Sequence, residues 1–187
     1  MLESIKNIDE KLFLILNGTH NAFFDAVMYW SSEKFFWIPF YALLLWLMYR
    51  KLKGKTFLLL FFIILLIAVT DQTSVRFFKN VFLRLRPCHE PHLEGLVRLV
   101  ADSCGGMYGF ISNHAANTFA LAWFLSGALR KKMRFIAPAL LLWASLVSYS
   151  RIYVGVHYPG DVLAGALWGV IVSIVILFFY RFIEKKI

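Results

Sequence analysis

Two histidines and an aspartate are the residues of this sequence best suited to catalysis. His157 and Asp161 are four residues apart, across a turn into an expected helix. This spacing lets a carboxylate hold one ring nitrogen of the histidine and leave the other as a neutral nucleophile. His114 can then act as a general acid. The pattern favours phosphoryl transfer to His157, protonation of the departing oxygen by His114, and hydrolysis of the phosphohistidine by water.

Donors suited to a tetrahedral phosphate are expected at the same level. Ser112 can cap a helix that begins near residue 111, and Pro159 suits the first position of another helix. Both helix N-termini favour anions through their free N–H groups and their dipoles. A single cation here would be explained by snorkelling toward lipid phosphates, but several cations beside two histidines favour a binding site. These cations are Lys79, Arg86 and Arg151.

The elements that must bring these residues together are long apolar helices. The chain of 187 residues is 60% hydrophobic and 17% charged, which argues against a soluble globular protein, a disordered chain or a coiled coil. A bilayer-spanning helix needs about 20 largely apolar residues. The sequence therefore predicts an all-α fold, a polytopic membrane bundle with five transmembrane helices. The stretches without Asp, Glu, Lys or Arg are 35–49, 56–70, 103–129, 135–150 and 162–180.

The basic residues predict which helix ends face the cytoplasm. The net charge is +9, yet nucleic-acid binding is not expected, because the cations cluster at the ends of apolar runs. The clusters within 50–55, 130–134 and 181–186 fit cytoplasmic loops under the positive-inside rule. The connections 81–111 and 151–161 then lie outside, with the candidate site. Pro87 disfavours helical geometry at Arg86, so the second helix is predicted to end there.

The N-terminal segment is predicted to lie on the membrane surface. Residues 8–32 are interrupted by Asn17, Gly18 and Thr19, and both halves contain acids. This pattern favours two amphipathic helices in the outer interface, with a sixth transmembrane helix as the alternative. We expect one domain over residues 1–187, made of the interfacial segment 1–32 and a transmembrane bundle over 33–183.

Three blocks of the sequence together carry a family resemblance. Lys79 stands before Arg86-Pro87 with six residues between, Ser112-Asn113-His114 forms the second block, and Ser150-Arg151 stands before His157 and Asp161 in the third. This arrangement resembles the three-part signature of the type 2 phosphatidic acid phosphatase superfamily. The resemblance implies a metal-independent lipid phosphatase without a cofactor. Its nucleophile would be His157, oriented by Asp161, and His114 would be the acid.

The resemblance also implies which residues grip phosphate, namely Lys79, Arg86, Ser112, Asn113 and Arg151. The second block departs from the usual Pro-Ser-Gly-His of the family, with Ile111 for the proline and Asn113 for the glycine. Asparagine still donates its backbone N–H and tolerates left-handed geometry better than most residues. We therefore expect function to survive, with an altered phosphate pocket.

The expected partners are the bilayer and a lipid phosphate whose tail stays in it. The first expectation is undecaprenyl diphosphate, to which the resemblance most often points in a small outward-facing bacterial-type protein. Lipid A phosphates, phosphatidylglycerol phosphate and phosphatidic acid are alternatives. The expected location is a bacterial inner membrane, with the site facing the periplasm or exterior. Nothing in the sequence indicates an oligomeric state.

A small membrane transporter is the rival function from another class. Transporters place charges near the membrane midplane, whereas here only Asp71 lies clearly at depth. We expect Asp71 to make a structural polar contact, with Ser74 or a nearby cation as its partner.

The outer connection 81–111 contains both cysteines of the chain, Cys88 and Cys104. An oxidising compartment favours a disulfide between them. His89 and His92, with Glu90 between them, could suggest a metal, but two loop histidines without further ligands are a weak signal, so no metal site is expected.

Overall fold

The structure, a computed structural model, describes residues 2–100, 103–129 and 133–186. Within these ranges the regular structure is helical, with one isolated β-bridge between Leu85 and Tyr108. A π-helical turn over Val75–Lys79 joins α4 to α5, and short 3₁₀ turns occur at Phe35–Trp37, Lys53–Lys55, Pro87–His89 and Pro91–Leu93. The α-helices are α1 (Leu2–Gly18), α2 (Ala22–Ser32), α3 (Ile38–Leu52), α4 (Thr56–Ser74), α5 (Asn80–Phe82), α6 (Asn113–Leu129), α7 (Ile136–Tyr153) and α8 (Pro159–Glu184).

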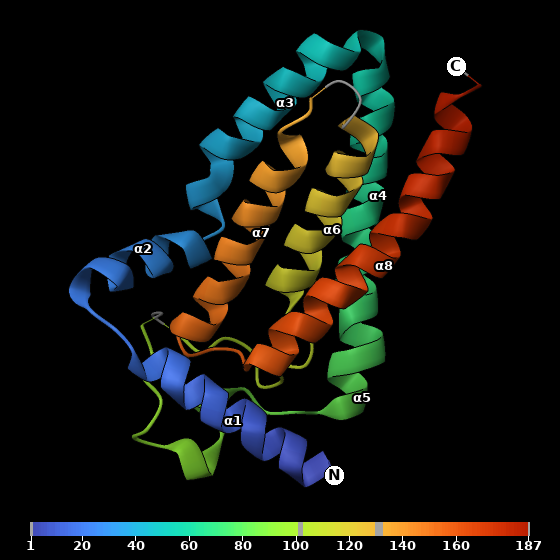
Figure 1. Cartoon of the computed structure of the whole chain (residues 1–187). Coiled ribbons are helices and arrows are strands. Elements are labelled where there is room, and N and C mark those ends of the chain that lie inside the picture. The colour runs from blue at the N-terminus through green and yellow to red at the C-terminus, as the bar shows by residue number, and fades with distance from the viewer. Residues whose placement is uncertain (1, 101–102, 130–132, 187) are drawn as a thin grey trace.

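Five long helices form the bundle that the sequence predicts. Figure 1 shows α3, α4, α6, α7 and α8 side by side, with α1 across one end. Each of the five charge-poor stretches overlaps one of these helices. Within the described residues, three helical stretches are long and apolar enough to cross a membrane: Phe35–Phe82, which contains both α3 and α4, Ile136–Tyr153 and Pro159–Glu184. The expected all-α membrane bundle is therefore confirmed, while the number of spans stays a prediction.

The centre of the bundle is α6, which packs against α4, α7 and α8. Small residues allow this close packing, since Ala115, Ala116 and Ala120 are fully buried. The partner helix α8 presents glycines at the crossing: a Cβ added at Gly169 would lie 2.1 Å from the backbone oxygen of Ala116. A Cβ added at Gly165 would lie 2.6 Å from the backbone oxygen of Ser112. Glycine at these positions lets the two backbones approach, as in other membrane helix pairs.

We expect Gly169→Ala to destabilise the bundle strongly. The new methyl group would meet backbone rather than a movable side chain, so α6 and α8 must separate. The expected loss is about 3 kcal/mol, the upper end of the usual cost of overpacking. Thermal unfolding of the detergent-purified protein measures it. Gly54→Ala is the matched control because no atom lies within 4 Å of its added Cβ; equal unfolding temperatures for both variants would contradict the packing argument.

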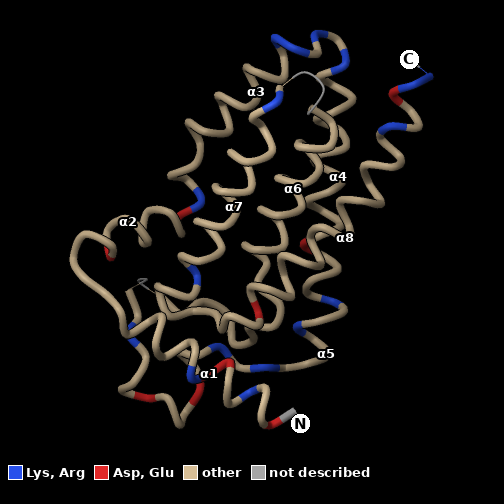
Figure 2. The backbone as a smooth tube through the Cα atoms, in the orientation of Figure 1, with Lys and Arg blue, Asp and Glu red and all other residues tan. Residues whose placement is uncertain are grey.

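Basic residues gather at the end of the bundle that is away from α1. Figure 2 shows Lys and Arg along the connection between α3 and α4 and at the end of α8. Arg130, Lys131 and Lys132, which the sequence predicts in a cytoplasmic loop, lie outside the described residues. On the flanks of α8, large apolar side chains are exposed, among them Leu163 (71%) and Phe178 (68%). An apolar flank with charged ends is what a bilayer requires.

Two local predictions differ in outcome. The N-terminal segment does form two helices, and they are separated at residues 19–21, where the Asn21 side chain accepts a hydrogen bond from the Phe24 backbone N–H. The expected end of the second span at Arg86 is wrong. The helix ends at Phe82, because Leu83 adopts left-handed geometry with φ 47° and ψ 29°. Arg86 is extended, as expected before a proline.

Candidate active site

A cavity of about 460 Å³ opens among α3, α4, α6 and α7, close to the start of α8. Six of the predicted site residues line it: Lys79, Arg86, Asn113, His114, Arg151 and His157. Asp161 and Ser112 do not line it. Asp161 lies behind His157, and Ser112 is buried where α6 begins, with its backbone N–H donating to the carbonyl oxygen of Asp161 at 3.0 Å. The fold thus brings together residues that are up to 82 positions apart in the chain.

The predicted histidine and carboxylate face one another. Nδ1 of His157 lies 3.4 Å from Oδ2 of Asp161, and that oxygen also accepts the backbone N–H of Tyr158 at 3.1 Å. Both side chains are almost completely buried. With Nδ1 directed at the carboxylate, the other ring nitrogen, Nε2, is available for chemistry. The local turn from α7 into α8 produces this pair, because Pro159 begins α8 and places Asp161 in its first turn.

Burial makes His157 difficult to protonate. Desolvation lowers the pKa of His157 well below the usual value for histidine, and the positive charges of Arg86, Arg151 and Lys79 lower it further. A neutral imidazole is the nucleophilic form. The neutral imidazole, the form that the predicted nucleophilic role requires, is therefore the expected form of His157 at neutral pH.

The lowered pKa predicts activity in mildly acidic solution. Protonation of His157 would remove the predicted nucleophile, and a lowered pKa means that this protonation needs a more acidic solution than an ordinary histidine does. The acidic limb of kcat/KM, which reports the free enzyme, should therefore lie below about pH 6.5, the usual histidine pKa. A pH profile corrected for the ionisation of the substrate measures it. An acidic limb above pH 7 would contradict the burial argument.

In the part of the chain that the structure describes, two arginines of the site have a buried donor without a hydrogen-bond partner. Nη1 of Arg86 donates to the Cys104 carbonyl oxygen at 3.0 Å, and Nη1 of Arg151 donates to the Ser32 hydroxyl and backbone oxygen. In both guanidinium groups, however, Nε is buried and has no hydrogen-bond partner among the described residues. A buried unpaired donor is costly unless a ligand satisfies it. Because both arginines line the cavity, an anion is the group that would complete them.

Asp71 bonds to residues of α6 rather than to its own helix. Its Oδ1 accepts from Nδ2 of Asn113 at 2.7 Å and from Nδ2 of Asn117 at 3.4 Å. The expected structural polar contact is therefore present, but Ser74 is not the partner, since its hydroxyl donates to the Thr70 carbonyl oxygen. Asn113, which stands where the family usually has glycine, is thus held by a carboxylate from α4.

Sequence reasoning missed several residues of the cavity. Ser32 is the last residue of α2, Lys34 lies in the connection between α2 and α3, and Asn117 lies one turn beyond Asn113 on α6. An aromatic wall completes it with Trp37, Tyr41 and Trp143. The polar run 31–34 before the first apolar stretch is a signal that would have indicated the α2 end. The aromatic wall has no such signal, because aromatic residues occur throughout the apolar helices.

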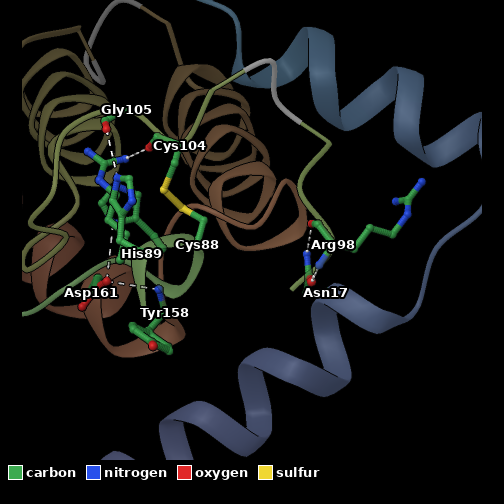
Figure 3. The surroundings of a disulfide bond; sticks show 10 residues. Asn17, Cys88, His89, Arg98, Cys104, Gly105, Tyr158 and Asp161 are labelled. Carbon is green, nitrogen blue, oxygen red and sulfur yellow. Dashed lines mark hydrogen bonds and ion pairs between the residues drawn. A yellow bond between two sulfur atoms is a disulfide. The ribbon is translucent and has the colours of Figure 1, made fainter. Parts of the chain in front are cut away.

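The loop that joins α5 to α6, next to the site, is closed by a disulfide. Cys88 and Cys104 are bonded, with Cα atoms 6.0 Å apart (Figure 3). This is the pairing that the sequence predicts. The Cys104 carbonyl oxygen accepts from Arg86, and Nε2 of the neighbouring His89 lies 3.2 Å from the Gly105 carbonyl oxygen. The cross-link therefore fixes a segment that holds one of the two arginines.

Comparisons with known proteins agree with this geometry. A profile of the PAP2 superfamily matches residues 55–185. The chain is 40% identical over 171 residues to the lipid A 4'-phosphatase of Bacteroides thetaiotaomicron, covering 90% of this chain and 75% of that protein. It is 32% identical over 164 residues to the undecaprenyl-diphosphatase of Sulfolobus acidocaldarius, covering 85% and 72%. The crystal structure of Aquifex aeolicus LpxE has a TM-score of 0.64 and 28% identity, over 89% of this chain and 93% of that one.

The profile match covers most of the chain and includes all three sequence blocks. The two relatives compared above are named lipid A 4'-phosphatase and undecaprenyl-diphosphatase, both phosphatases of membrane lipids. The chain therefore belongs to the PAP2 superfamily and is a membrane lipid phosphatase of that type.

Proposed function

We propose that this protein removes a phosphate monoester group from lipid A through a phosphohistidine intermediate. The observation that carries the choice of lipid is the 40% identity, over 90% of the chain, to a protein named lipid A 4'-phosphatase. This differs from the first expectation from sequence, undecaprenyl diphosphate. That lipid is the second candidate, favoured by the relative at 32% identity.

The proposed reaction has two steps at the cavity. Nε2 of His157 attacks phosphorus, the bond between phosphorus and the lipid oxygen breaks, and His114 gives a proton to that oxygen. Water then attacks the phosphohistidine, His114 takes up a proton from it, and inorganic phosphate leaves. Charge develops on the phosphoryl oxygens in both steps. Lys79, Arg86 and Arg151 are positioned to stabilise it.

The cavity supports a lipid substrate because its walls differ in chemistry. The cations and histidines form one region, and Ile67, Leu121 and Val147 form an apolar one. A lipid can place its phosphate in the first region while its apolar portion stays close to the second and to the bilayer. By the charge distribution, we propose that the site faces the periplasm or exterior of a bacterial inner membrane.

Phosphate release by detergent-purified protein tests the proposal. The panel contains lipid A, undecaprenyl diphosphate, phosphatidylglycerol phosphate, phosphatidic acid and p-nitrophenyl phosphate, each with EDTA present. We expect release from lipid A to have the highest kcat/KM and to survive EDTA. A higher kcat/KM for undecaprenyl diphosphate would transfer the assignment to that lipid. Loss of all activity in EDTA would refute the metal-independent reaction.

A further inference from the structure

The N-terminal helix α1 reaches the carboxylate that orients the proposed nucleophile. Nη1 of Arg84 donates to Oδ1 of Asp161 at 2.9 Å, and Nη2 of the same guanidinium group donates to Oδ2 of Asp9, on α1, at 2.7 Å. Building on the proposed phosphohistidine reaction, we propose that Arg84 and Asp9 are positioning residues for catalysis. The helix α1 is then a working part of the active site rather than only a membrane-surface segment.

Arg84 balances a charge that the fold has buried. The Asp161 side chain is completely inaccessible to solvent, and a buried carboxylate is strongly destabilising without a cation. Oδ2 of Asp161 faces His157 and the Tyr158 N–H, so the arginine at Oδ1 completes the surroundings of both oxygens. The guanidinium carbon of Arg84 also lies 4.0 Å from the centre of the Tyr158 ring. These contacts fix the direction in which the carboxylate points.

Asp9 holds the same assembly from the side of α1. Its Oδ2 binds Arg84, and its Oδ1 accepts the backbone N–H of Gly160 at 2.7 Å, in the first turn of α8. A carboxylate is favourable at the positive end of a helix. Residue 160 must be small for this approach, because an added Cβ would lie 2.7 Å from Oδ2 of Asp9.

The other end of α1 is also anchored to the region of the site. Asn17 is almost fully buried, and its Nδ2 donates to the carbonyl oxygens of Arg98 and Tyr153, both at 2.8 Å. Its Oδ1 accepts the Arg98 N–H at 2.8 Å, as Figure 3 shows. Hydrogen bonds therefore join helix α1 to the loop between α5 and α6 and to the end of α7. These hydrogen bonds hold α1 in place, so the Asp9 carboxylate keeps its position beside Arg84 and Gly160.

These contacts form one series from α1 to the nucleophile, in the order Asp9, Arg84, Asp161, His157. The orientation of Asp161 decides which ring nitrogen of His157 keeps its proton, and the wrong tautomer cannot attack phosphorus. Arg84 does not line the cavity. Its loss should thus change the reactivity of His157 without removing a contact to substrate. The proposal predicts a fall in kcat with little change in KM.

The test uses the full-length protein with p-nitrophenyl phosphate, so that it does not depend on the identity of the lipid. For Arg84→Met we expect kcat to fall about 10- to 100-fold, the range typical when the outer partner of an essential side chain is removed. KM and the inhibition constant of inorganic phosphate should stay within about two-fold, since the residues that bind the phosphate group are unchanged in this variant. Arg84→Lys, which keeps the charge, should recover part of the loss. Asp9→Asn should lower kcat less than Arg84→Met.

Arg98→Met is the matched control. The side chain of Arg98 also joins the loop between α5 and α6 to the N-terminal segment, through its ion pair with Asp25 on α2. It bonds to neither Asp161 nor His157. Arg98→Met therefore removes a partly exposed ion pair, as Arg84→Met does, and should leave kcat unchanged. Thermal unfolding of every variant separates loss of folded protein from loss of reactivity.

Two sets of results decide the matter. If folded Arg84→Met has the kcat of Arg98→Met, or if its KM rises in proportion to the loss of kcat/KM, the positioning role is refuted. If His157→Ala retains activity in the same assay, the phosphohistidine proposal fails instead. A double variant, Asp9→Asn with Arg84→Met, adds a further check. Its loss should be smaller than the product of the two single losses, because residues of one network are not additive.

Discussion

Replacing His157 by alanine should abolish phosphate release. We expect kcat/KM to fall by about 10⁴-fold or more for every substrate, the scale seen when a covalent nucleophile is removed. The methyl side chain has no nitrogen to attack phosphorus, while the cations of the cavity remain. Binding of inorganic phosphate should therefore change little. Initial rates with p-nitrophenyl phosphate and with lipid A measure the effect, and inhibition by phosphate measures the binding.

A covalent intermediate offers a second measurement of the same prediction. Wild-type protein quenched in alkali during turnover of a labelled phosphate ester should carry label on histidine, and His157→Ala should carry none. His20→Ala is the control, since His20 is an exposed histidine away from the cavity. Equal labelling of the wild type and His157→Ala would show that another residue forms the intermediate.

Replacing His114 by glutamine should give an effect that depends on the leaving group. His114 lines the cavity in the first turn of α6, where its proposed role is to protonate the departing lipid oxygen. Loss of a general acid costs about 10²- to 10⁴-fold in rate. We expect this full loss with a lipid phosphate, whose oxygen leaves poorly without a proton. The transfer step with p-nitrophenyl phosphate should be much less affected, because p-nitrophenolate is stable as an anion.

The second proposed step predicts a kinetic effect that is specific to His114→Gln. His114 also takes the proton from the attacking water, so the phosphohistidine of His114→Gln should accumulate. A burst of p-nitrophenol followed by slow turnover, in stopped-flow measurements, is the expected result. Asn117→Ala is a suitable control, because Asn117 lines the same cavity one turn further along α6. An equal loss with both leaving groups and no burst would argue against acid–base catalysis by His114.

Some interactions of the site are local enough to be read from the sequence. His157 and Asp161 meet because a turn and the start of a helix place positions four apart side by side. The apolar stretches predict the bundle, since only helices satisfy their backbone within a bilayer. Cys88 and Cys104 lie in one loop, so their pairing needs little knowledge of the fold. The predicted helix end at Arg86 is wrong because Pro87 only marks the last position that the helix could reach. The actual end is set by Leu83 in left-handed geometry, and a leucine does not indicate that geometry in a sequence.

The sequence by itself determined the helical membrane architecture, the three motif blocks and the residues that they contribute to the cavity. Only the tertiary structure decided what holds those residues: Ser32 against Arg151, Asp71 against Asn113, and Arg84 with Asp9 against Asp161. It also showed that Ser112 is buried beside the cavity rather than lining it. The physical reason is distance along the chain. Periodicity and motif spacing record neighbours within a few turns, whereas these supporting contacts join residues 42 to 119 positions apart and exist only once the helices have packed.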